Sequence, residues 1–200
     1  DSLIIIYMSW PWLVYNNGKL VTLNFLENRF QIKNKEKFSL PDGSDPLLIW
    51  DMRGIQKNRP DPSTLPLTPK RQVFVDSGSF YGEDIIDCIM ADRGEVILPL
   101  RNLNGFGELD VALDFAENLI IGIDYTDKVL AKHSDFSNMS LFDLINHLKN
   151  LKIKRFLITI LGGNPPSFPS SMIDDLDFYF AKINKNITVP YGSKGVFELV

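Results

Sequence analysis

Short apolar runs that end in a polar residue recur along this chain. The segment Asn118-Leu-Ile-Ile-Gly-Ile-Asp124 is one example. A run of this length and composition is typical of a strand buried on both faces, as in parallel sheets. We therefore predict that Asp124 lies at the carboxyl end of a strand. The same pattern predicts strands at 3–8, 47–50, 73–75, 95–100, 119–123, 155–161 and 187–189.

Helical patterns occupy several of the gaps between these runs. Residues 140–151 carry apolar side chains at helical spacing after Ser140, a plausible N-cap. Residues 170–183 place acidic residues early and Lys182 late, as the helix dipole favours. A shorter helix is predicted at 83–92. Alternating strands and helices indicate a parallel sheet with right-handed crossovers.

Polar or glycine-rich residues follow nearly every predicted strand. In a closed barrel the carboxyl ends of all strands gather on one face, where such folds place their sites. We therefore predict an α/β fold, a TIM (β/α)8-like barrel, as a single domain over residues 1–200. The residues expected at that face are Asp51, Asp76, Arg101, Asn102, Asp124, Gly162-Gly-Asn164 and Gly192-Ser-Lys-Gly195.

Two regions depart from an ideal eightfold barrel. Residues 19–40 alternate like a β-hairpin that turns near Glu27-Asn28, and this hairpin replaces the first outer helix. Only a few residues separate 187–189 from 195–200, whereas a parallel crossover needs roughly a dozen. The barrel is therefore expected to be incomplete, without a regular eighth strand. Its open edges predict a homodimer, or else a plug formed by residues 19–40.

Composition narrows the classes of partner. The net charge is -4 and the pI is about 5.2, with Lys and Arg scattered along the chain, which argues against nucleic-acid binding. The apolar run at 3–8 is too short to span a bilayer and lacks a basic leader, so no membrane association is expected. The lone Cys88 excludes an internal disulfide and is compatible with a cytoplasmic protein. No cofactor is predicted.

Four segments, taken in order, resemble proFAR isomerase, the phosphoribosyl isomerase of histidine biosynthesis. Asn17-Gly-Lys-Leu-Val-Thr-Leu23 is similar to a segment after that family's first strand, and Leu48-Ile-Trp-Asp-Met-Arg-Gly54 to its second strand. Val75-Asp-Ser-Gly-Ser79 resembles the third strand. The segment that ends at Asp124 resembles the fifth strand, whose terminal aspartate is catalytic in the family. The resemblance covers most of the chain, but each motif is short.

The resemblance implies acid–base chemistry on an aminoaldose phosphate, in which one carboxylate accepts a proton and another donates one. Asp124 matches the second carboxylate of that pair. The first has no match, because the corresponding position is Val14 in one alignment and Ser9 in another. The resemblance therefore implies a divergent member of the family.

The candidate site residues fall into two groups. Asp124, Asp51 and Asp76 are candidates for chemistry, and if all three converge they could bind a hard divalent cation; no metal ligand is assigned. Ser77-Gly78 and the loop Gly192, Ser193, Lys194 and Gly195 could present backbone N–H groups and one positive charge to a phosphate. Arg101, Gly162 and Gly163 are further candidate ligand-binding residues.

Two hypotheses from different classes follow. In the first, the barrel is related to the isomerase and either binds a phosphorylated, sugar-like metabolite or performs other acid–base chemistry through Asp124. In the second, it is a non-enzymatic interaction or scaffold protein whose incomplete barrel is closed by a partner subunit. The sequence leaves both open.

Overall fold

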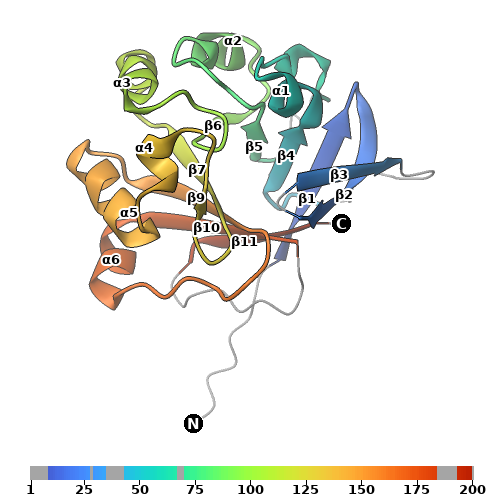
Figure 1. Ribbon diagram of the computed structural model, residues 1–200. Coiled ribbons are helices and arrows are strands. Elements are labelled where there is room, and N and C mark those ends of the chain that lie inside the picture. Colours follow the sequence, from blue (N-terminus) through green and yellow to red (C-terminus); the bar gives the residue numbers. More distant parts are fainter. Residues whose placement is uncertain (1–8, 28, 35–42, 67–69, 184–192, 200) are drawn as a thin grey trace.

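Eight parallel strands form a closed barrel at the centre of the molecule (Figure 1). The computed structural model describes residues 9–27, 29–34, 43–66, 70–183 and 193–199. β11 pairs in parallel with both β10 and β1, which closes the ring. The predicted TIM-like barrel is therefore confirmed. Its strands are β1 (Ser9–Asn16), β4 (Leu47–Asp51), β5 (Val73–Asp76), β6 (Glu95–Pro99), β7 (Ile120–Tyr125), β9 (Arg155–Ile160), β10 (Asp177–Lys182) and β11 (Gly195–Leu199).

Helices lie around the outside of the barrel (Figure 1). The predicted N-cap at Ser140 is confirmed, because its hydroxyl accepts a hydrogen bond of 3.1 Å from the Asp143 backbone N–H. Among the described residues no helix is long and apolar enough to cross a bilayer. The helices are α1 (Met52–Lys57), η1 (Pro62–Thr64, a 3-10 turn), α2 (Asp84–Met90), α3 (Phe106–Phe115), α4 (Ser134–Ser137), α5 (Leu141–Asn150) and α6 (Ser170–Asp175).

The predicted hairpin is confirmed as β2 (Lys19–Leu26) and β3 (Arg29–Asn34). It begins at Asn17-Gly18, whose φ angles of 51° and 72° fit the tight turns that Asn-Gly favours. β1 pairs with β11 through its first half and with β2 through its second half. The hairpin thus extends the sheet at the carboxyl end of the barrel, beyond the last residue of β11.

The helix predicted at 170–183 is wrong in its second half. α6 ends at Asp175, and residues 177–182 form β10, the seventh barrel strand. Every residue from Phe178 to Lys182 is buried, because one face of β10 lines the barrel and the other packs against the outer layer. An apolar run buried on both sides has no periodicity that separates a strand from a helix.

This change in the seventh strand corrects the expectation of an incomplete barrel. β10 ends at Lys182 and β11, the eighth strand, begins at Gly195, so these two strands are separated by the roughly dozen residues that a parallel connection needs. The runs at 3–8 and 187–189 lie outside the described residues. Because β11 closes the ring, the open edges that motivated the homodimer are not present in the described barrel. The homodimer itself stays a prediction, without that support.

Large side chains fill the middle of the barrel. Trp12 and Trp50 pack edge to face with their ring centroids 4.6 Å apart, and Phe74 packs against Phe197 at 5.4 Å. All four side chains are buried in one cluster. A ligand therefore has room only at an end of the barrel.

Candidate functional site

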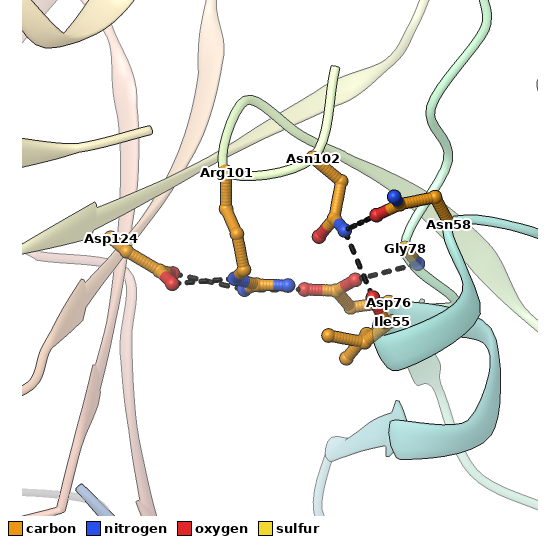
Figure 2. A network of polar contacts seen from close by, with 7 residues as sticks. All are labelled: Ile55, Asn58, Asp76, Gly78, Arg101, Asn102 and Asp124. Carbon is orange, nitrogen blue, oxygen red and sulfur yellow. Dashed lines mark hydrogen bonds and ion pairs between the residues drawn. The ribbon is translucent and has the colours of Figure 1, made fainter. Parts of the chain in front are cut away.

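A buried ion-pair network lies at the carboxyl end of the barrel. Asp76 ends β5, Arg101 follows β6, and Asp124 lies near the end of β7, so three neighbouring strands bring them together. Figure 2 shows the Arg101 guanidinium between the two carboxylates. Arg101 Nε and Nη2 donate to Asp124 Oδ2 and Oδ1 at 2.5 and 2.9 Å. Nη2 also donates to Asp76 Oδ2 at 2.9 Å.

Aromatic rings flank the guanidinium of Arg101. Its Cζ atom lies 4.3 Å from the ring centroid of Trp50, on β4, and 5.7 Å from that of Phe30, on the β2–β3 hairpin. Both distances are within the range of cation–π attraction. Two carboxylates and two aromatic rings therefore fix the Arg101 side chain, which is only 10% exposed.

Burial and the ion pairs have opposite effects on the pKa values of Asp76 and Arg101. Desolvation raises the pKa of Asp76, although the charge of Arg101 and hydrogen bonds from Arg101 and Gly78 oppose the shift. Burial by itself would lower the pKa of Arg101, but the charges of Asp124 and then Asp76 outweigh it and raise that pKa. Arg101 therefore stays charged, and Asp76 is the carboxylate whose proton affinity the surroundings increase.

A second chain of hydrogen bonds joins the loop after β6 to α1. Asn102 Nδ2 donates to Ile55 O at 2.9 Å and to Asn58 Oδ1 at 2.6 Å (Figure 2). Lys132 Nζ donates to the same Asn58 oxygen at 2.5 Å. Asn58 is the C-cap of α1 in the left-handed region, with φ 52°, a conformation that Asn tolerates well. These contacts hold the Arg101-Asn102 loop in one place.

A cavity of about 640 Å³ opens above the network. The hairpin forms one wall and α1 another. A third wall is the arm after β7, where the short strand β8 (Val129–Leu130) pairs antiparallel with β7. Lys132 N donates to Arg101 O at 3.2 Å and ties this arm to the loop after β6. The lining residues are Phe25, Arg29, Phe30, Met52, Ile55, Gln56, Arg101, Asn102, Asp124, Lys128, Val129, Leu130, Ala131, Lys132, Ser137, Asn138 and Leu161.

Three of the cations that line this cavity have no carboxylate partner among the described residues. Arg29, Lys128 and Lys132 make no ion pair in that part of the chain. Burial, followed by the nearby charge of Arg101, lowers the pKa of Lys132. The lining thus has four cations, Arg29, Arg101, Lys128 and Lys132, and one carboxylate, Asp124. The cavity is therefore a local concentration of positive charge in a chain whose net charge is -4.

The three predicted aspartates do not form one cluster. Asp76 and Asp124 face the barrel interior and share Arg101, whereas Asp51 follows the inward-facing Trp50 and caps α1. Asp51 Oδ1 accepts a 3.1 Å hydrogen bond from the Arg53 backbone N–H. Burial raises the pKa of Asp51 to about 6, against the lowering effect of backbone N–H groups. No group of three His, Cys, Asp or Glu side chains placed to hold a metal ion occurs in the described residues.

The glycine-rich segments after β5 and β9 are occupied by internal contacts. Gly78 N–H donates to Asp76 Oδ1 at 3.1 Å, and Ser77 is buried. After β9, a Cβ on Gly163 would meet the Asp127 carboxylate, and the Asn164 N–H donates to the same carboxylate at 3.2 Å. None of Ser77, Gly78, Gly162 and Gly163 lines the cavity.

The loop before β11 lies at the opposite end of the barrel. Ser193 and Lys194 precede β11, and Gly195 is its first residue, so they do not follow a strand as predicted; Gly192 lies outside the described residues. Lys194 Nζ pairs with Asp177 Oδ1, at the start of β10, at 2.5 Å. The predicted placement of this loop after a strand was wrong, because the seventh barrel strand is β10, at 177–182.

Several cavity residues were not identified from the sequence. Phe30 and Arg29 come from the hairpin, whose position over the barrel end depends on the pairing of β2 with β1. Lys128 and Lys132 lie on either side of the short strand β8, in a segment without a recognisable motif. The one sequence signal that points to these two lysines is their position shortly after the predicted strand that ends at Asp124.

Neither models of known protein families nor curated proteins match this sequence. The resemblance to proFAR isomerase therefore rests on the short motifs alone and stays a prediction. In the structure Asp124 lies in the fifth strand of the barrel, and the side chain of Val14 faces the barrel interior from the first.

Proposed function

We propose that the protein binds a small phosphorylated metabolite in the cavity at the carboxyl end of the barrel. The observation that carries this proposal is the set of three cations around one cavity, Arg29, Lys128 and Lys132, that make no ion pair within the described part of the chain. These three residues are exposed at the cavity, where their like charges repel one another, and a bound anion relieves that repulsion. Phosphate carries up to two negative charges and several acceptor oxygens, so it suits such a set.

The cavity also has the size and mixed lining of a small-molecule site. Its volume of about 640 Å³ lies inside the roughly 300–1,000 Å³ common for such sites. Phe25, Phe30, Ile55 and Leu161 supply apolar walls between the polar groups. A ligand of several carbon atoms, beyond phosphate alone, fits this lining.

The state of Asp124 favours binding over proton transfer. Both of its carboxylate oxygens accept hydrogen bonds from Arg101. The Asp124 carboxylate is therefore engaged by an internal partner, and that pair would have to break before the carboxylate could turn toward a substrate. We therefore place ligand binding before isomerisation. The alternative scaffold hypothesis loses one argument, because the described barrel closes without a partner.

The test is isothermal titration of the purified protein with phosphorylated metabolites, with inorganic phosphate as the simplest probe. We expect the double variant Lys128→Gln/Lys132→Gln to weaken binding about tenfold or more, because two charge-assisted contacts are lost. The matched control is Lys152→Gln/Lys154→Gln, which removes the same charge near the start of β9, at the other barrel end. Equal binding by both double variants would contradict the proposed site.

A further inference from the structure

Two adjacent residues at the floor of the cavity, Arg101 and Asn102, each have one buried polar atom without a hydrogen-bond partner among the described residues. Arg101 Nη1 is a buried donor with no partner among the described residues, and Asn102 Oδ1 is a buried acceptor in the same situation. Both residues line the cavity. A buried polar group without a partner is costly, and native structures leave few of them.

The orientation of the Asn102 amide follows from its neighbours. The Lys132 ammonium can only donate, so the Asn58 atom that it contacts at 2.5 Å must be the amide oxygen. Asn102 therefore meets that oxygen at 2.6 Å and the Ile55 carbonyl at 2.9 Å through its NH2 group. Turning the amide over would set its oxygen against two other oxygens. Oδ1 is consequently the atom left for a ligand.

The charge of the cavity floor differs from that of its rim. At the floor Arg101 is surrounded by Asp76 and Asp124, so one positive charge faces two carboxylates. The net charge of these three side chains is therefore negative, or zero when Asp76 carries a proton. At the rim Arg29, Lys128 and Lys132 have no such compensation among the described residues. An anion is therefore attracted to the rim and is not attracted to the floor, although the floor contains an arginine.

We infer that the ligand binds with its anionic group at the rim and with a neutral group that both accepts and donates a hydrogen bond at the floor. The neutral group accepts from Arg101 Nη1 and donates to Asn102 Oδ1. A hydroxyl group satisfies both requirements, as does a primary amide. This inference rests on the proposed function and adds the direction of binding and a second recognised group.

The inference is tested with two probes of equal charge and carbon number, ribitol 5-phosphate and n-pentyl phosphate. For the wild-type protein we expect at least about tenfold tighter binding of ribitol 5-phosphate, because the alkyl chain leaves the buried donor and acceptor unpaired. Equal affinity for the two probes would overturn the inference and leave the proposed function intact. No binding of either probe would overturn the proposed function, and the inference with it.

Variants separate the floor from the rim. Asn102→Ala should remove most of the preference for ribitol 5-phosphate while it preserves the affinity for n-pentyl phosphate. Asn104→Ala, an exposed residue of the same loop that does not line the cavity, is the matched control and should leave the preference unchanged. Arg29→Gln/Lys128→Gln, which changes two rim residues outside the Asn58–Asn102 network, should weaken both probes by the same factor. If folded Asn102→Ala still prefers ribitol 5-phosphate, Asn102 does not contact the neutral group and the inference is contradicted. Should the variant not fold, the comparison of the two probes on the wild-type protein still tests the inference.

Discussion

Arg101 and Asp124 form a two-point ion pair at the carboxyl end of the barrel, with N–O distances of 2.5 and 2.9 Å. This fork-to-carboxylate geometry is the strongest that the two side chains can adopt. Asp124 is the residue that the sequence marks most clearly for chemistry. In the structure its carboxylate is instead the partner that fixes the orientation of Arg101.

Loss of Arg101 should be strongly destabilising. Arg101→Met leaves Asp76 and Asp124 buried without their shared cation, and breaking a buried pair in this way typically costs about 3–5 kcal/mol. Urea unfolding measures the change. The deficit should shrink in acid, where Asp76, whose pKa burial raises, becomes neutral. Arg53→Met is the control, because Arg53 and Asp61 are each more than a third exposed and such pairs contribute at most about 1 kcal/mol. Similar losses in both variants would contradict the prediction.

Asp51 should make the protein less stable as the pH rises. Its pKa is about 6 in the folded chain against an ordinary value of 3.8, so between these pH values the folded state holds a proton that the unfolded state has lost. The free energy of unfolding therefore falls through this window and stays lower above it. Two pKa units correspond to an upper value of about 3 kcal/mol.

Asp51→Asn should abolish this dependence. Asn caps helices as well as Asp does and carries no charge to desolvate, so the variant should be more stable than wild type at pH 7.5 by about 1–3 kcal/mol. The two proteins should approach one another near pH 4. Urea unfolding across pH 4–8 checks this, with Asp110→Asn, at an exposed position of α3, as the control for the change of charge. A variant less stable than wild type at pH 7.5 would count against the role of desolvation.

Closure of the barrel at β11 predicts an intolerant glycine. A Cβ at Gly195 would overlap the ring of Trp10 on β1, so Gly195→Ala should destabilise the protein by about 1–3 kcal/mol or more. Gly107→Ala offers the opposite case, because Gly107 lies in α3 with open space around it. That change should be neutral or stabilise by up to about 1 kcal/mol. Thermal melts of the two variants give the comparison, and a harmless Gly195→Ala would argue against the pairing of β11 with β1.

Isomerisation of proFAR should be undetectable with the purified protein. The position that the resemblance assigns to the first carboxylate is Val14 or Ser9, and Asp124 is held by Arg101. General acid–base catalysis contributes roughly a hundred- to ten-thousand-fold, and most of that should be missing. An absorbance assay with proFAR measures turnover. Turnover that disappears in Asp124→Asn would show that another group replaces the missing carboxylate.

The sequence alone determined the class of the fold and the place of the acidic residues. Buried runs such as Ile120–Tyr125 and the alternating pattern of residues 19–34 are local signals, because the period of a strand or hairpin is written in consecutive residues. An aspartate at the end of such a run must lie at the carboxyl end of the barrel. For this reason Asp76, Arg101 and Asp124 could be expected on one face before the structure was known.

Only the tertiary structure decided which of these residues meet. Asp51 and Asp76 both end strands, but Asp76 is in register with Trp50, the residue before Asp51. Because successive residues of a strand face opposite sides, Asp76 points inward to Arg101, whereas Asp51 points outward and caps α1. The identity of β10 depended on burial from two sides, which no local period reveals. The cavity depended on the β2–β3 hairpin and the arm at 125–132 meeting over the barrel end. Contacts between segments so distant in the chain arise from packing and pairing, which the order of residues does not display.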